Sequence, residues 1–146
     1  MTTLERAIEI AAKAHTGQTD KAGGPYILHV LRVTLALSTP SERIAAVLHD
    51  VVGDTDITLG QLRAEGFGDA ILHAVEALTK RTGERRIDAG ARAAADPIAR
   101  VVKLADVADN EAMTRTLASS PQNALALEEY GQVRTLLQAA AIPKGS

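Results

Sequence analysis

The sequence predicts an all-α domain of about seven or eight helices. The chain has 146 residues, and its apolar fraction of 46% is rich in alanine and includes only three aromatic residues. An interior of alanine, leucine and valine suits packed helices better than a β-sheet, in which β-branched and aromatic residues are enriched. Proline also follows Thr, Asp or Ser at three places, which is typical of helix starts. Because the length is that of one domain, residues 1–146 are expected to form one unit.

The N-terminal half is expected to contain four helices, each with its own start. Thr2 and Glu5 resemble a capping box before the first helix. A glycine-containing loop over 16–25 separates this helix from the second. The other three helices are expected over residues 26–37, from Pro40 to about Val52 behind the cap residue Thr39, and from a Thr58–Gln61 capping box to about Ala64.

The C-terminal half shows the same kind of punctuation. Residues 68–80 predict an amphipathic helix, and the charged segment 81–95 predicts a loop and a weak helix interrupted by Gly83 and Gly90. Two cap-plus-proline pairs then open the remaining helices. These run from Asp96-Pro97 through Asp106, and from Ser120-Pro121 to about Ala141, before a frayed tail at 143–146.

Charge, cysteine content and hydropathy exclude several classes of protein. The net charge is −2 and no basic stripe occurs, which argues against a nucleic-acid groove. The absence of cysteine excludes disulfides and cysteine-ligated zinc. No apolar run reaches the roughly 18 residues of a membrane-spanning helix, and MTTLERAIEI lacks the apolar core of a secretion signal. We therefore expect a cytoplasmic protein that binds neither nucleic acid nor a membrane.

Two polar residues interrupt the most apolar helix of the chain. Residues 42–52 are apolar nearly all round, so this helix is expected to be central, yet His49 and Asp50 lie in its middle. Burial of an unpaired carboxylate costs several kcal/mol or forces it neutral. Taken alone, this helix fits a divalent metal and a structural His–Asp pair equally well.

Two further polar residues on apolar faces favour the metal. His29 interrupts YILHVLRV, and Asp106 ends IARVVKLAD on the same face as Ala99 and Val102. Two imidazoles and two carboxylates from three core helices suit Mn²⁺, Fe²⁺ or Zn²⁺. The other histidines are expected to play no part, because His15 ends the first helix, where a protonated imidazole is favourable, and His73 has surface acids nearby.

Four stretches of the chain resemble the HD-domain hydrolases of the RelA/SpoT type, and most closely the stand-alone small alarmone hydrolases. They lie within about residues 5–112 and read AAKAHTGQTDKAGGPYILHV (11–30), AAVLHDVVGDT (45–55), FGDAILHAVEALTK (67–80) and VVKLADVADN (101–110). The resemblance implies an HD-domain helical bundle that binds one Mn²⁺ through His29, His49, Asp50 and Asp106. It also implies removal of the 3′-pyrophosphate from (p)ppGpp to give GDP or GTP.

The catalytic part of the resemblance is incomplete. Where the family has Glu followed by Asp, this chain has Gly53 and Asp54. The missing Glu is thought to position or deprotonate the attacking water, and a general base is worth about 10²–10⁴ in rate. We expect Asp54 to take this role, with Glu111 from the last motif as an alternative. The glycine has a structural explanation too, as the residue that ends its helix.

The implied substrate site is also altered. The family's Arg-Lys pair beside the guanine base is Asp20-Lys21 here, and an Asp repels phosphate. Lys21, Asn110 and Lys80 are the residues expected to hold the substrate, whereas the arginines of 81–95 are either phosphate contacts or solvated. The family's residues after KLAD are replaced at Val107, Asp109 and Met113.

Three functions remain open at this point. The first is a Mn²⁺-dependent phosphohydrolase that acts on (p)ppGpp. The second is a catalytically weakened or inactive HD protein that binds metal or nucleotide, as the changes at Gly53 and Asp20 suggest. The third is an HD phosphatase of another phosphorylated nucleotide or metabolite. A small phosphorylated nucleotide is the expected partner, and the helix at 121–141 fits either a monomer or a homodimer.

Overall fold

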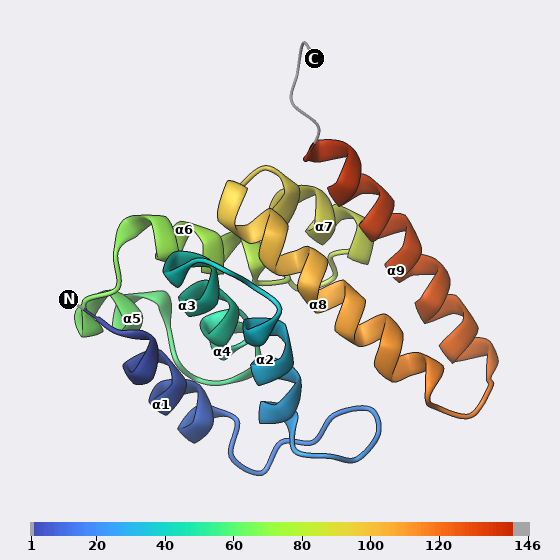
Figure 1. The fold of residues 1–146 in the computed structure, drawn as a ribbon, viewed down its shortest axis with the longest axis horizontal. Coiled ribbons are helices and arrows are strands. Elements are labelled where there is room, and N and C mark those ends of the chain that lie inside the picture. The colour runs from blue at the N-terminus through green and yellow to red at the C-terminus, as the bar shows by residue number, and fades with distance from the viewer. Residues whose placement is uncertain (1, 142–146) are drawn as a thin grey trace.

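A computed structural model describes residues 2–141, and in this range the chain forms helices and no β-strand (Figure 1). The all-α prediction is confirmed. The described range contains nine helices rather than seven or eight, because one expected helix is divided in two. The helices are α1 Leu4–Ala14, α2 Tyr26–Leu35, α3 Pro40–Leu48, α4 Val51–Asp54, α5 Leu59–Glu65, α6 Asp69–Leu78, α7 Arg86–Ala94, α8 Pro97–Arg115 and α9 Pro121–Ala140.

Four of the nine described helices begin at cap residues that the sequence predicted. Capping boxes open α3 at Thr39 and α5 at Thr58, and proline follows the caps of α8 and α9. The first cap is Thr3 rather than Thr2, since the Thr3 side chain accepts from the Arg6 N–H. Thr2 instead donates to the Glu65 carbonyl at the end of α5. The capping box predicted for Thr2 and Glu5 is therefore wrong by one residue.

The expected helix from Pro40 to Val52 breaks at His49 and Asp50, the two polar residues in its middle. The His49 N–H bonds the Ala46 carbonyl three residues back, at 3.3 Å, and the His49 ring bonds the same carbonyl. This tighter turn ends α3, and α4 then adds one further turn. The break lets two consecutive side chains approach each other, with His49 Nε2 only 2.9 Å from Asp50 Oδ2.

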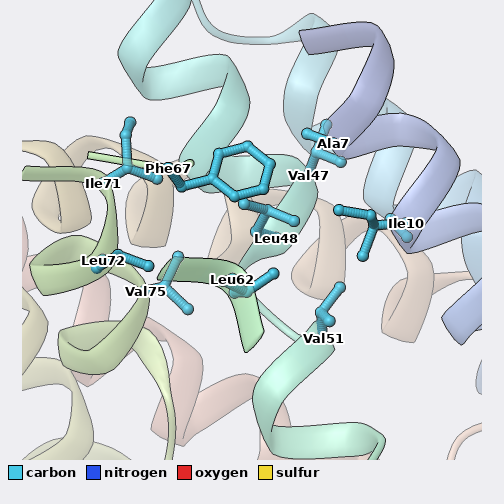
Figure 2. Close-up of a cluster of buried hydrophobic side chains, with 11 residues drawn as sticks. Ala7, Ile10, Val47, Leu48, Val51, Leu62, Phe67, Ile71, Leu72 and Val75 are labelled. Carbon is cyan, nitrogen blue, oxygen red and sulfur yellow. The ribbon is translucent and has the colours of Figure 1, made fainter. Parts of the chain in front are cut away.

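α3 is the central helix of the bundle. Its residues Ala45 to Leu48 are all buried, and their side chains divide between two parts of the core. One part joins α3 to α1, α5 and α6 through residues such as Phe67 and Leu62 (Figure 2). The other joins α3 to α2, α6 and α8. The polar turn after Leu48 is therefore held in place on several sides by apolar packing.

A third part of the core joins α7, α8 and α9, with α9 running alongside α8 (Figure 1). Gly90 lies inside α7 and does not interrupt it. A Cβ built on Gly90 would come within 2.9 Å of Val133 Cγ1 on α9, so only glycine permits this close approach. α8 also continues nine residues past Asp106, to Arg115. In the described range no helix is both long and apolar enough to cross a membrane.

Candidate metal centre and adjoining cavity

The four predicted metal ligands come together at one point in the bundle. They are His29 of α2, His49 and Asp50 at the α3–α4 turn, and Asp106 of α8. One possible ligand atom from each residue lies within 4.8 Å of those of the other three. His29, His49 and Asp106 are buried, and Asp50 is partly buried. The arrangement forms a cluster of two imidazoles and two carboxylates that could hold a metal ion.

The ring of His49 supports the fit of a cation in this cluster. Its Nδ1 donates to the Ala46 carbonyl, which leaves Nε2 as the atom that faces the carboxylates. Nε2 is buried and has no hydrogen-bond partner of acceptable geometry, although it lies 2.9 Å from Asp50 Oδ2 and 3.4 Å from Asp106 Oδ1. A buried polar atom without a partner needs an explanation. A divalent ion between the imidazole nitrogens and the carboxylates supplies one, because this donor set suits Mn²⁺, Fe²⁺ or Zn²⁺.

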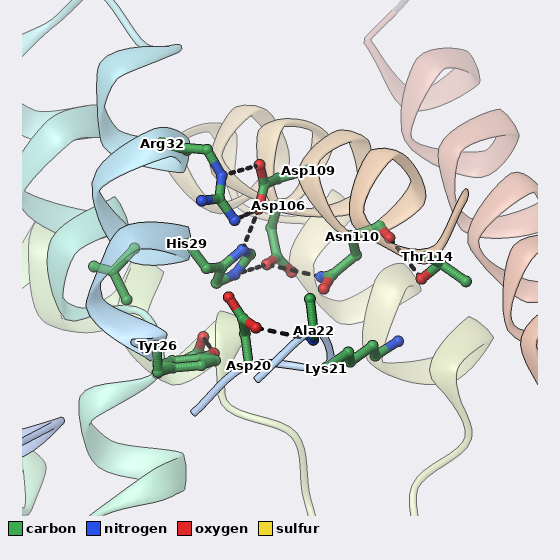
Figure 3. A network of polar contacts seen from close by, with 12 residues as sticks. Asp20, Lys21, Ala22, Tyr26, His29, Arg32, Asp106, Asp109, Asn110 and Thr114 are labelled. Carbon is green, nitrogen blue, oxygen red and sulfur yellow. Dashed lines mark hydrogen bonds and ion pairs between the residues drawn. The ribbon is translucent and has the colours of Figure 1, made fainter. Parts of the chain in front are cut away.

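The other cluster members are also oriented by neighbours. His29 Nε2 lies 3.0 Å from Asp106 Oδ1, while its Nδ1 lies 2.6 Å from Asp109 Oδ2 (Figure 3). The Tyr26 hydroxyl donates to Asp50. Asp109 and Tyr26 therefore hold two of the cluster residues from outside, as is usual around a metal site.

Asp106 has two further partners on its own helix. Asn110 Nδ2 donates to Oδ1 at 3.2 Å (Figure 3). Lys103 Nζ donates to Oδ2 at 3.1 Å. Burial alone would raise the pKa of Asp106, but Lys103, His29 and His49 outweigh burial and hold this pKa well below its usual range. Asp106 is thus an anion near neutral pH, as a metal ligand must be.

The pKa values of the two cluster histidines are shifted in the opposite direction to that of Asp106. Burial alone would lower the pKa of His49, but the charges of Asp50 and Asp106 outweigh burial and raise that pKa well above its usual range. The pKa of His29 is raised as well, because hydrogen bonds that the ring makes to Asp106 and Asp109 outweigh its burial. The raised pKa values favour protonated imidazoles when no metal is bound, so a metal competes with protons for this cluster.

A cavity of about 270 Å³ adjoins the cluster. The cavity meets the cluster at Lys103 and Asn110, which line the cavity and donate hydrogen bonds to Asp106. Lys80 and Arg86 lie in its wall, together with Lys103, so three cations line the same space. The rest of the wall is largely apolar and comes from Leu78, Ala89, Ala93, Val107, Tyr130 and Val133. A cavity of this kind suits a ligand with an apolar ring and several negative charges.

Two of the three predicted substrate residues, Asn110 and Lys80, line this cavity, and Lys21 reaches it through Tyr130 of α9. Lys21 Nζ donates to the Tyr130 hydroxyl and lies 4.8 Å from the ring centroid. The Arg86 guanidinium lies 4.7 Å from the same centroid. The sequence did not predict a role for Tyr130. It also did not predict that α9 lines the cavity, which it does through Tyr130 and Val133. The sequence offers one signal for Tyr130, which is that it is the only aromatic residue after Phe67.

Asp54 and Glu111, the two candidates for the missing base, have different surroundings. Asp54 lies on α4 at an exposed position, and the protein atoms that replace part of the water around its carboxylate, together with the charge of Asp50, raise its pKa. Its catalytic role stays a prediction. Glu111 is buried between α8 and α9, where it accepts from Arg115 at 3.3 Å and from Arg134. The suggestion that Glu111 replaces the base is therefore wrong, because its carboxylate is already held by two arginines.

Gly53 is not required by the backbone. It lies inside α4, so the prediction that it ends its helix is wrong, and it is not among the glycines with positive φ. A Cβ at this position would lie 3.6 Å from Thr79 Cγ2, an ordinary van der Waals distance. The fold would therefore accept a larger side chain here.

Asp20 has a structural role in the loop before α2. Its Oδ1 accepts from the Ala22 N–H at 2.9 Å (Figure 3). The same atom accepts from the Gly24 N–H at 2.9 Å. This side chain shapes the loop that carries Lys21, as Asp often does in turns.

The remaining two histidines lie outside the cluster. His15 ends α1, as predicted, but it is buried and its Nδ1 lies 2.8 Å from Gln18 Oε1. His73 is exposed on α6, as predicted.

Comparisons with known proteins agree with this architecture. The family model for the HD domain matches residues 7–141. A protein from Streptomyces coelicolor named GTP pyrophosphokinase is 37% identical over an alignment of 138 residues, and the match covers 86% of this chain and 16% of the relative. A protein from Aquifex aeolicus named guanosine-3′,5′-bis(diphosphate) 3′-pyrophosphohydrolase is 41% identical over an alignment of 81 residues, and the match covers 53% of this chain and 12% of the relative.

The solved structures include one of similar fold, described as a metazoan ortholog of SpoT that hydrolyzes ppGpp. It matches 96% of this chain and 88% of its own, with a TM-score of 0.80 and 22% sequence identity. The chain spans less than a fifth of the length of the two curated relatives. Because the family model covers nearly all of the described residues, the chain belongs to the HD domain family.

Proposed function

We propose that this chain is a Mn²⁺-dependent phosphohydrolase that removes the 3′-pyrophosphate of (p)ppGpp and leaves GDP or GTP. The observation that carries the proposal is the four-residue His/Asp cluster beside a cavity lined by Lys80, Arg86 and Lys103. The names of relatives support the same substrate, since both curated relatives are named for guanosine nucleotide chemistry. The name GTP pyrophosphokinase belongs to a protein of which the match covers only 16%, so it carries less weight for the reaction itself.

The residues of the chain divide into two groups under this proposal. His29, His49, Asp50 and Asp106 would hold the ion. Such an ion supplies Lewis-acid chemistry, because it offsets phosphate charge and makes water a better nucleophile near neutral pH. The cations of the cavity would offset the remaining charge of the pyrophosphate through charge-assisted hydrogen bonds.

The hydrolysis breaks the bond between phosphorus and the ribose 3′-oxygen. The oxygen of the attacking water ends on the released pyrophosphate, and a proton goes to the 3′-oxygen. Asp54 would accept the proton of the water, which its raised pKa favours. Asn110 and the Lys21–Tyr130 pair would contact the nucleoside part of the substrate at the cavity wall.

We also propose that the protein works as a monomer in the cytoplasm, where guanosine nucleotides are used. α9 packs on α7 and α8 of its own chain, which supports a monomer. Light scattering of the purified protein checks this part of the proposal, and a stable dimer would contradict it.

The second candidate is a weakened or inactive HD protein that still binds metal or nucleotide. Gly53 in place of Glu, in a helix that does not need glycine, is the observation that favours it. This alternative keeps the metal cluster and the cavity and removes only the catalytic base.

Incubation of the purified protein with ppGpp and Mn²⁺ separates the candidates. The first predicts equal amounts of GDP and pyrophosphate, and the loss of both with a chelator. An Asp106→Asn variant serves as the control that lacks one metal ligand. If metal binds and no pyrophosphate appears, the hydrolase proposal fails for this substrate. A panel of other phosphorylated nucleotides and sugar phosphates then distinguishes an inactive protein from a phosphatase of a different metabolite.

A further inference from the structure

Asp109 of α8 connects the cluster residue His29 to Arg32, a surface residue of α2. We infer that Asp109 is a positioning residue for the metal: its carboxylate, held by Arg32, fixes the His29 ring with Nε2 directed to the ion and strengthens that bond. The inference rests on the metal site of the proposed function. It concerns a residue that differs from the one the resembled family has at this position.

The geometry is that of a three-residue chain across two helices. His29 and Arg32 lie three residues apart on α2, so both side chains face α8. Asp109 Oδ2 accepts from His29 Nδ1 at 2.6 Å, and Asp109 Oδ1 accepts from Arg32 Nε at 2.7 Å (Figure 3). Arg32 Nη2 also donates to Oδ2, at 3.1 Å. The paired contacts of the guanidinium fix both oxygens of the carboxylate.

The exposed fraction of the three linked side chains increases from the cluster to the surface. The His29 side chain is 2% exposed, that of Asp109 is 15% exposed and that of Arg32 is 46% exposed. The series therefore runs from the buried cluster out to solvent. Arg32 holds the carboxylate from the solvent side, while the imidazole is shielded from water, where a hydrogen bond to an anion has most effect.

The chemistry follows from the two nitrogens of the imidazole. A proton held on Nδ1 by Asp109 leaves the lone pair of Nε2 for a metal. Nε2 already lies toward the cluster, 3.0 Å from Asp106 Oδ1. The negative charge of Asp109 makes the imidazole a stronger donor, and loss of such an outer partner typically weakens metal affinity by about 10–100-fold.

A plain ion pair between α2 and α8 is the alternative explanation. It would change the thermal stability of the protein and leave the metal affinity unaltered. The metal affinity is therefore the readout that distinguishes a positioning residue from a structural one.

The test compares Mn²⁺ affinity, measured by calorimetry, for the wild-type chain, Asp109→Ala and Asp109→Asn. We expect Asp109→Ala to bind Mn²⁺ about 10–100-fold more weakly. Asp109→Asn should fall between the two, because its amide oxygen still accepts from Nδ1 without the charge. Asp69→Asn is the matched control, since it also removes an aspartate–arginine contact, to Arg63 at 2.7 Å, on the exposed surface of α6.

A second readout needs no metal. In nitrogen-correlated NMR spectra of the metal-free protein, the wild type should show a slowly exchanging proton on His29 Nδ1, and Asp109→Ala should lose it. Wild-type Mn²⁺ affinity in folded Asp109→Ala and Asp109→Asn overturns this inference alone. Absence of the Nδ1 proton in the wild type also overturns it. A wild-type chain that binds no Mn²⁺ overturns the metal site of the proposed function as well.

Discussion

Gly53 offers the sharpest test of catalysis, because the structure allows the missing carboxylate to be restored there. The perturbation is Gly53→Glu, with Gly53→Gln as a control of the same size and no charge. The new Cβ would lie 3.6 Å from Thr79 Cγ2 and the backbone is helical, so neither a clash nor backbone strain is expected. If the proposed hydrolase lacks only its base, Gly53→Glu should accelerate the release of pyrophosphate from ppGpp.

The magnitudes separate catalysis from stability. Replacing a helical glycine by Glu or Gln gains up to about 1 kcal/mol in helix propensity. The added charge of Glu lies next to the exposed Asp54 in the sequence, and repulsion between exposed charges offsets at most about 1 kcal/mol of this gain. A general base contributes about 10²–10⁴ in rate, which corresponds to about 2.7–5.4 kcal/mol of activation free energy. Stability changes alone cannot account for an acceleration of that size.

The assay is single-turnover release of GDP and pyrophosphate from ppGpp at saturating Mn²⁺. Gly53→Glu is expected to be at least about 100-fold faster than Gly53→Gln, while the Mn²⁺ affinity of the two variants stays similar. Equal rates for the Glu and Gln variants would refute the reasoning, because the carboxylate would then add nothing. In that case the base is another group, or the site performs no hydrolysis.

Three further predictions follow from the same geometry. Lys80→Met should raise the KM for ppGpp by about 10-fold or more, since a charge-assisted hydrogen bond is worth about 1.5–3 kcal/mol; exposed Lys13→Met is the control, and an unchanged KM would remove Lys80 from the substrate site. Gly90→Ala should lower the free energy of unfolding by about 1–2 kcal/mol in chemical denaturation. The new Cβ would come within 2.9 Å of Val133, and this overlap outweighs the gain of about 1 kcal/mol in helix propensity. A more stable variant would contradict the close approach of α7 to α9. The metal-free protein should lose thermal stability as the pH rises through the raised pKa values of His29 and His49, because protonation of these rings stabilises the folded state at lower pH. The affinity for Mn²⁺ should rise over the same pH range, because the metal displaces these protons. A Mn²⁺ affinity that does not depend on pH would contradict proton displacement.

The sequence by itself determined the helices and the four members of the cluster. Cap residues and apolar periodicity act over about four residues, so Thr39, Asp96 and Ser120 could be recognised as helix starts without knowledge of the fold. The cluster was recognisable for a related reason. A charged residue on an otherwise apolar face, such as Asp106, has to find a compensating partner in the interior.

Only the tertiary structure decided which groups surround the cluster. Tyr130 meets Lys21 across 109 positions of sequence, and Asp109 meets His29 across 80. Glu111 lies five residues after Asp106, yet its side chain faces Arg134 of α9 and not the cluster. Such contacts depend on how whole helices pack against one another. They leave no local pattern in the sequence, because polar residues are usually found at the solvent-exposed surface. The break of α3 at His49 is also absent from the pattern of apolar residues, which is that of one continuous helix.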